Sequence, residues 1–192
     1  MQQRRQSPWR NSVALSLVEV SLKGATVCAP KRDPLIAMTQ PLRRRTRARE
    51  IALQLLFQFD LRGERYEQEA GESIQQLLAH DSHGDEEVLT FAKRLVEGTL
   101  QHRDELDERL RTVTRNWELK RMAGVDRNVL RMSMFELMHC ADVPPKVAIN
   151  EAIELGKKFS TANSGGFING ILDRVRLDIE QERTVKKQAE NS

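Results

Sequence analysis

Apolar residues recur every three or four positions along most of the chain after Arg43, which is the spacing of one face of an α-helix. In the first such segment, 49–61, Ile51, Leu55 and Phe59 follow one another four residues apart. Further segments with this spacing lie at 72–80, 88–100, 103–113, 125–140, 146–159 and 167–179. No segment alternates apolar and polar residues for long enough to form a strand. The pattern predicts an all-α domain of about seven helices.

Polar and helix-breaking residues separate these segments. Asp85 offers an N-cap carboxylate ahead of 88–100, and Pro144 and Pro145 stop the segment 125–140. Aromatic residues make up only 5% of the chain and charged residues 31%, a composition that favours a charged helical protein over a β-rich one.

The length of 192 residues allows one domain, at about 150 residues per domain. We expect this helical domain to occupy residues 43–183. A flexible N-terminal extension over 1–42 precedes it in this interpretation, and a C-terminal tail over 184–192 follows it.

The sequence predicts neither a membrane-spanning segment nor a secreted protein. The longest apolar run has four residues, Leu35 to Met38, against about 20 needed to span a bilayer. Glu19 and Lys23 interrupt the apolar part of an N-terminal stretch that superficially resembles a secretion signal. Only two cysteines are present, so we expect no disulfide framework and place the protein in the reducing cytoplasm. We favour Met38 as the biological start, which would make 1–37 a flexible or mis-assigned extension.

Charge is distributed unevenly along the chain. The net charge is +3, but the segment 43–49, RRRTRAR, contains five arginines and no acidic residue. Residues 50–192 contain 20 basic and 26 acidic side chains. A polyanion would therefore meet the basic front of the domain, and a basic protein could meet its acidic body.

The motifs of common enzyme and metal sites are missing from the sequence. It contains no phosphate-cradling glycine motif and no nucleophile elbow. His80 and His83 lie three apart and His139 adjoins Cys140, but neither pair has two further ligands at zinc spacing. We expect a binding protein rather than an enzyme, with no cofactor and no metal site.

The arginine run carries the clearest functional chemistry, because guanidinium groups pair with phosphates and stack on bases. The run continues directly into a helix, which would hold Arg47 and Arg49 on a folded surface. Phe57 lies away from the main apolar stripe, so it is either a partly exposed ring for stacking or protein contact, or a core residue. Single-stranded RNA fits this pattern better than duplex readout, whereas a merely solubilising basic tail is the alternative.

Three blocks of the sequence resemble the NusB family of bacterial transcription antitermination factors across about 140 residues. They are RRRTRAREIALQLLFQFD, GVDRNVLRMSMFEL and VPPKVAINEAIELGKKFSTANSGGFINGILDRV. The resemblance implies an all-α fold of two small packed helical bundles. It also implies binding to the boxA element of ribosomal RNA transcripts, a heterodimer with the ribosomal protein NusE, and a role in the transcription elongation complex.

The resemblance assigns two groups of residues by motif. Those expected to face RNA are Arg43, Arg44, Arg45, Arg47, Arg49, Lys157, Lys158, Asn163, Ser164, Gly165, Gly166 and Phe167. Those expected to contact a partner protein are Phe57, Asp126, Arg131 and Glu136. Phe167 is a candidate stacking ring, although a helix-start residue packing inward is the alternative.

The chain departs from the family pattern at two places, and other functions are conceivable. Phe57 stands where the family often has a tyrosine, and the long front extension is atypical. The family domain also occurs fused to an rRNA cytosine methyltransferase, but we reject that function because the chain ends at Ser192 without a cofactor-binding domain. A helical adaptor that binds protein but no RNA is the remaining alternative, and some relatives form homodimers that hide the RNA site.

Overall fold

The computed structural model describes residues 34–63, 84–114 and 118–190. Contacts divide the chain into the units Met1–Asp33 and Pro34–Ser192, and the helices described here belong to the second. They are α1 (Pro34–Arg62), α3 (Glu86–Gln101), α4 (Arg103–Thr114), the 3-10 helix η1 (Leu119–Arg121), α5 (Gly124–His139), α6 (Pro145–Phe159) and α7 (Ser164–Glu190). Within the described ranges no strand is present, and the prediction of an all-α fold is confirmed. The predicted helix at 72–80 lies outside the described residues.

Two helices are longer than their apolar pattern indicates. Helix α1 begins at Pro34, ahead of Arg43, and α7 continues past Arg183 to Glu190. The part of α7 beyond Arg183 is exposed through residue 189, so no apolar stripe marks it. Apart from Thr184 and Val185, good helix formers fill this stretch, which has no glycine or proline, and their propensity favours continuation of the helix.

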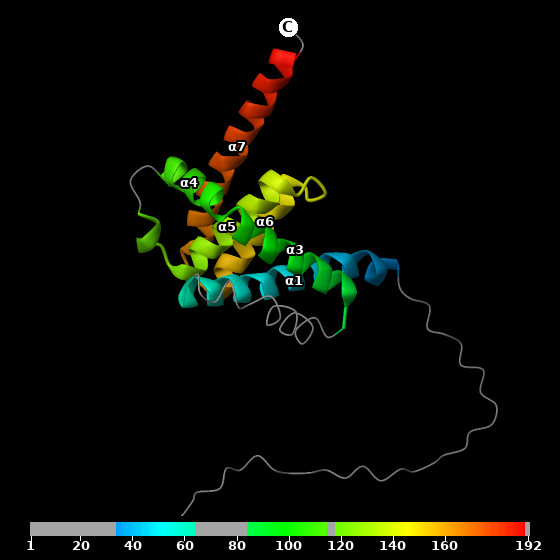
Figure 1. The fold of residues 1–192 in the computed structure, drawn as a ribbon. Coiled ribbons are helices and arrows are strands. Elements are labelled where there is room, and N and C mark those ends of the chain that lie inside the picture. The colour runs from blue at the N-terminus through cyan, green and yellow to red at the C-terminus, as the bar shows by residue number, and fades with distance from the viewer. Residues whose placement is uncertain (1–33, 64–83, 115–117, 191–192) are drawn as a thin grey trace, which may run out of the picture. The chain divides into compact units, whose positions relative to one another are not determined.

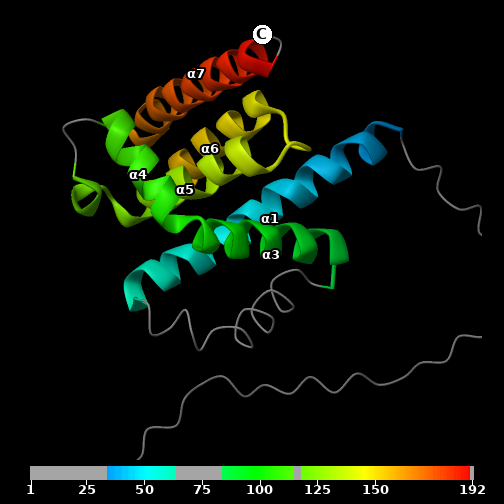
Figure 2. The ribbon, with the colours of Figure 1, turned by 45° about the horizontal axis from the view of Figure 1, so that its top comes forward.

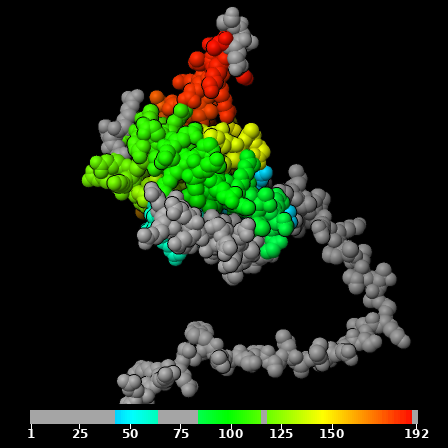
Figure 3. Space-filling model, viewed as in Figure 1, coloured from blue at the N-terminus to red at the C-terminus, as the bar shows by residue number. Residues whose placement is uncertain are grey.

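The helices form two groups around α5. Helix α1 packs mainly along α3, whereas α6 and α7 pack on each other and on α5 (Figure 1). Figure 2 shows the same grouping from another side, with α5 and α6 between α7 and α1. Helix α4 contacts both α5 and α7, and the far end of α7 projects beyond the other helices (Figure 3). This arrangement agrees with two small packed bundles.

Close backbone approach at one glycine brings the two groups together. A Cβ atom on Gly98 of α3 would lie 2.0 Å from Cζ of Phe135 of α5. The ring of Phe135 therefore occupies the space that any side chain at position 98 would need. Phe135 is 6% exposed and belongs to the main apolar core.

Helix α5 is central, and the core includes charged groups on its buried surface. Arg131 and Glu136 are buried, together with Asn128 and Ser133. No described helix is both long enough and apolar enough to cross a membrane.

Candidate nucleic-acid interface

Four arginines in the middle of α1 reach the surface of the protein. Arg43 and Arg47 are exposed, and Arg44 and Arg45 are half-buried. The four lie within five consecutive residues, so more than one turn of the helix presents guanidinium groups.

Arg44 is held by the start of α3. Its Nε lies 2.8 Å from Oδ2 of Asp85, and its Nη1 lies 3.0 Å from Oε2 of Glu87. Asp85 also accepts hydrogen bonds from the backbone N–H groups of Glu87 and Val88, which confirms it as the N-cap of α3. The capping carboxylate thus orients both a helix and an arginine.

Arg45 and Arg47 have acidic neighbours as well. Arg45 Nη2 lies 3.1 Å from Oδ2 of Asp142, and its guanidinium lies 4.7 Å above the ring of Phe91. Arg47 Nη1 lies 3.3 Å from Oε2 of Glu50. An ion pair as exposed as that of Arg45 with Asp142 contributes about 0–1 kcal/mol, so a phosphate can replace this carboxylate at small cost, whereas the carboxylate of Glu50 is more buried.

Arg49 differs from the other four, because the structure places it inside the protein. It is 2% exposed, with Nη2 2.7 Å from Oε2 and Nε 2.9 Å from Oε1 of Glu136. Its Nη1 lies 3.4 Å from Oε2 of Glu151. The expectation that Arg49 contacts RNA is therefore wrong for this structure. The physical reason is its helical position, four and seven residues before the buried Leu53 and Leu56, on a face that packs inward.

The two lysines of α6 extend the basic surface of α1. Lys157 and Lys158 are exposed, and Nζ of Lys158 lies 2.6 Å from Oε1 of Glu50. Glu50 also pairs with Arg47, so one carboxylate links cations that lie more than 100 residues apart in the chain. We call the surface formed by Arg43, Arg44, Arg45, Arg47, Lys157 and Lys158 the basic edge. The role of Glu50 as a shared partner of two cations was not predicted, because an acidic residue that follows an arginine run is usually a solvent-exposed side chain.

The loop between α6 and α7 is partly exposed and partly buried. Asn163 and Gly166 are exposed, and Phe167 is half-buried. Ser164 and Gly165 are buried, contrary to the expectation that they face RNA. Their inward placement follows from packing around them.

Ser164 and Gly165 shape the loop from within. Oγ of Ser164 donates to Oδ2 of Asp126 at 3.0 Å and accepts from the backbone N–H of Thr161 at 3.1 Å. A Cβ on Gly165 would lie 3.2 Å from Cγ of Lys157, so the lysine stem runs directly over this glycine. Ser164 therefore positions Thr161 and Asp126, and Gly165 leaves room for the stem of the exposed Lys157.

A surface pocket opens beside this loop. Arg121, Met122, Asp126, Thr161, Asn163 and Phe167 line it. Asp126 is 8% exposed, and no described donor reaches its buried Oδ1 atom. An unpaired buried carboxylate oxygen is costly, so the packing around Asp126 carries a free-energy penalty at this atom. Asp126, expected to contact NusE, thus lies beside the loop expected to contact RNA.

Two of the other residues assigned to a partner protein are internal. Arg131 is 5% exposed, with Nε 2.6 Å from Oδ1 of Asp107 and Nη1 3.0 Å from Oδ1 of Asp60. Glu136 is 1% exposed and holds Arg49. The expectation that these two side chains touch a partner is wrong for this structure, because other helices surround α5 on several sides.

Phe57 is half-buried and packs on the start of α5. A Cβ on Gly124 would lie 2.9 Å from Cε2 of its ring. The sequence left open whether Phe57 is a partly exposed ring or a core residue. In the structure its ring is partly buried and partly exposed.

Comparison with known proteins identifies the family. The model of the NusB family matches residues 46–176. The transcription antitermination protein NusB of Anaeromyxobacter dehalogenans strain 2CP-1 is 49% identical over 73% of this chain and 95% of its own length. That of Syntrophus aciditrophicus is 44% identical over 73% of this chain and 84% of its own.

Solved structures give the same result. NusB of T. maritima is 34% identical, with a TM-score of 0.59 over 69% of this chain and 89% of its own. A structure of the antitermination factors NusB and NusE in complex with double-stranded RNA is 27% identical, with a TM-score of 0.63 over 71% of this chain and 98% of its own. The chain belongs to the NusB family.

Proposed function

We propose that this protein is a transcription antitermination factor that binds the boxA element of ribosomal RNA transcripts together with NusE. Family membership supports this function, as does the similarity to a NusB–NusE complex with RNA. In this proposal the protein acts by binding, in the cytoplasm, as part of a transcription elongation complex.

The basic edge is the observation that carries the proposal. Arg47 and Lys158 share Glu50 as a partner, so α1 and α6 present their cations side by side. RNA phosphates would displace the carboxylate and release counterions from the strand, which makes binding weaken as salt rises.

The pocket beside the α6–α7 loop is proposed to receive bases. The ring of Phe167 offers a face for stacking, and Asn163 offers an amide that can donate and accept hydrogen bonds. Asp126 would act from below the pocket, where its Oδ2 accepts from Ser164 and thereby fixes the start of α7. Cations would hold the backbone of the strand, whereas this pocket would distinguish its bases.

Arg49, Arg131 and Glu136 serve the proposed function indirectly. They hold α1 and α4 against α5 and thereby fix the positions of the groups that meet RNA. NusE would then bind elsewhere on the acidic body of residues 50–192, whose charge suits a basic partner.

A salt series of RNA binding tests the proposal. Affinity for a boxA oligonucleotide is measured by fluorescence anisotropy, with and without NusE, for the wild type and for Arg47→Ala/Lys158→Ala. We expect the double variant to bind more weakly. Its plot of log affinity against log salt should be shallower by about 0.7 for each phosphate that the variant no longer neutralises.

Arg174→Ala is the matched control. Arg174 forms an exposed ion pair with Asp178 at 3.3 Å, the same separation as between Arg47 and Glu50, but on α7. The Arg174→Ala variant should bind RNA with the affinity of the wild type. Equal affinity of the double variant and the control would refute the role of the basic edge. Binding of NusE without any RNA binding would favour the adaptor function instead.

A further inference from the structure

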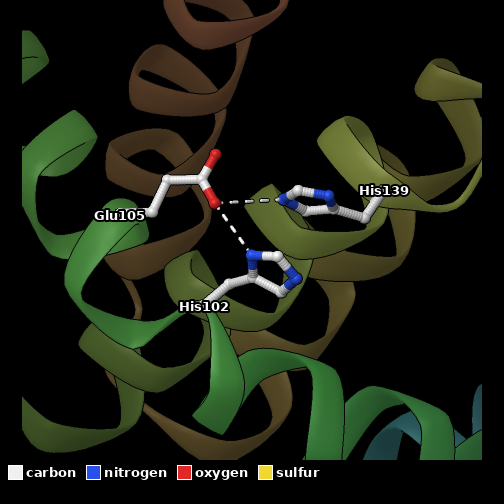
Figure 4. A group of neighbouring side chains, drawn as sticks. All are labelled: His102, Glu105 and His139. Atoms are coloured by element: carbon white, nitrogen blue, oxygen red, sulfur yellow. Dashed lines mark hydrogen bonds and ion pairs between the residues drawn. The ribbon is translucent and has the colours of Figure 1, made fainter.

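Three side chains with metal-binding atoms converge where three helices end or begin. His102 follows the last residue of α3, Glu105 lies in the first turn of α4, and His139 is the last residue of α5 (Figure 4). His139 and Glu105 lie 34 positions apart in the chain, so residue spacing alone does not reveal this cluster.

The donor atoms of the cluster face one another. Nδ1 of His102 lies 2.8 Å and Nε2 of His139 lies 3.5 Å from the same carboxylate oxygen, Oε2 of Glu105. One ligand atom from each residue lies within 4.8 Å of the other two. The two imidazole rings are stacked, with their centroids 4.0 Å apart.

A buried ring holds the two imidazoles in place. The ring of Phe135 lies 5.3 Å from that of His139 and 5.8 Å from that of His102, measured between centroids. Phe135 itself is fixed against the backbone of α3 at Gly98. The histidines thus pack on an apolar ring, and one nitrogen of each imidazole points toward Glu105 (Figure 4).

The backbone around the two imidazoles favours a cation, whereas Glu105 lies at the N-terminal end of α4. His102 is the C-cap of α3, and its N–H donates to the carbonyl of Gly98. His139 ends α5, so both imidazoles lie at helix C-termini, where the aligned peptide dipoles place partial negative charge. Glu105 adds a full negative charge and is half exposed, which leaves the cluster open to solvent.

We propose that His102, Glu105 and His139 bind one zinc ion, with water completing its coordination. Two imidazole nitrogens and one carboxylate oxygen form a zinc-type donor set, whereas magnesium and calcium prefer sets made of oxygen alone. Ligand distances of about 2.0–2.2 Å in a tetrahedron place neighbouring donors about 3.3 Å apart. Each imidazole nitrogen is already near that separation from Oε2 of Glu105, at 2.8 and 3.5 Å, and rotations of the partly exposed side chains would bring the two nitrogens, which lie within 4.8 Å, to the same ion.

The ion would add a link between parts of the fold that already pack through the ring of Phe135 and the ion pair of Arg131 with Asp107. It would join the junction of α3 and α4 to the end of α5, and it would bind the folded chain in preference to the unfolded one. The Tm of the protein should therefore rise as zinc is added. This proposal is independent of RNA binding.

The test uses the full chain, freed of metal by a chelator and titrated with zinc chloride in a calorimeter. We expect saturable binding of one zinc ion per chain and no comparable binding of magnesium or calcium. His139→Gln and Glu105→Gln should each weaken zinc binding by at least about tenfold, since each removes one of three protein ligands. Circular dichroism checks that the variants fold, and cobalt in place of zinc should give visible d–d absorption without a thiolate charge-transfer band.

Two variants serve as controls. Glu108→Gln removes an exposed carboxylate three residues further along α4, where Glu108 pairs with Arg111. His80→Gln/His83→Gln removes the two histidines outside the cluster. Both should bind zinc like the wild type. The proposal is overturned if zinc does not bind saturably, if the cluster variants bind as well as the controls, or if cobalt shows thiolate ligation.

Discussion

Arg49 and Glu136, 87 positions apart in the chain, form a bidentate ion pair inside the protein. Burial raises the pKa of Glu136 above its usual value, and the guanidinium of Arg49 opposes that rise. Glu136 would be an unpaired buried charge without Arg49, and Arg49 would keep only its 3.4 Å contact with Glu151, so the pair fixes α1 against α5.

Arg49→Ala is expected to destabilise the protein strongly. The substitution leaves the carboxyl of Glu136 buried without its partner, which costs about 3–5 kcal/mol of unfolding free energy. Urea unfolding followed by circular dichroism measures the change. Arg47→Ala, which removes an exposed arginine from the same helix, should change stability by less than about 0.5 kcal/mol. Equal stability of the two variants would contradict a structural role for Arg49.

Asp60→Asn is expected to change how stability depends on acid. Burial alone would raise the pKa of Asp60, but hydrogen bonds and charges from Arg127 and Arg131 outweigh it and hold the pKa below its usual value. A lowered carboxyl pKa stabilises the fold above the unfolded value of about 3.9, and this contribution is lost as pH falls through the folded pKa.

Urea unfolding of the wild type and Asp60→Asn over a pH series checks this expectation. The variant should be less stable near neutral pH, and the gap should narrow below about pH 4. Asp178→Asn, which removes the exposed partner of Arg174, should show a much smaller gap throughout. A gap for Asp60→Asn that stays constant with pH would show that the carboxylate charge is not what stabilises the fold.

Gly98→Ala is expected to be destabilising although alanine favours helices. Its Cβ would overlap the ring of Phe135, and forcing apart a packed core costs about 1–3 kcal/mol. At Gly170 of α7 a Cβ meets nothing within 4 Å, so Gly170→Ala should be neutral or stabilising. Thermal and urea unfolding compare the two, and similar effects would rule out the close contact as the cause.

Asp126→Ala distinguishes an RNA-facing role from a NusE-facing one. Loss of the Asp126 carboxylate removes the acceptor for Ser164, which positions the start of α7 beside the pocket, so affinity for boxA RNA should fall about 2- to 10-fold. NusE binding, measured by gel filtration of the mixture, should be unchanged. The exposed Asp173 provides the control variant Asp173→Ala, which should alter neither. Loss of NusE binding with unchanged RNA affinity would restore the assignment made from the sequence.

Local sequence patterns were sufficient for the helical class of the fold and for the family, but not for the full lengths of α1 and α7. Apolar residues such as Val88, Leu95 and Val96 recur with a helical period, because one side of the helix is buried away from water. The three motif blocks likewise identified the NusB family without any structure. The five arginines of residues 43–49 indicated where the basic edge begins, because the number of charged residues in a segment can be read directly from the sequence.

Tertiary packing decided which charged groups face solvent and which distant ones meet. Arg47 and Arg49 look alike in the sequence, but they lie about 200° apart around α1, and only the second points toward α5 and α6. Likewise, Lys158 reaches Glu50, and His139 reaches Glu105, through the folding of helices that are distant in the chain. A helical period records the direction of each side chain relative to its own axis, whereas burial and contact depend on where the other helices lie.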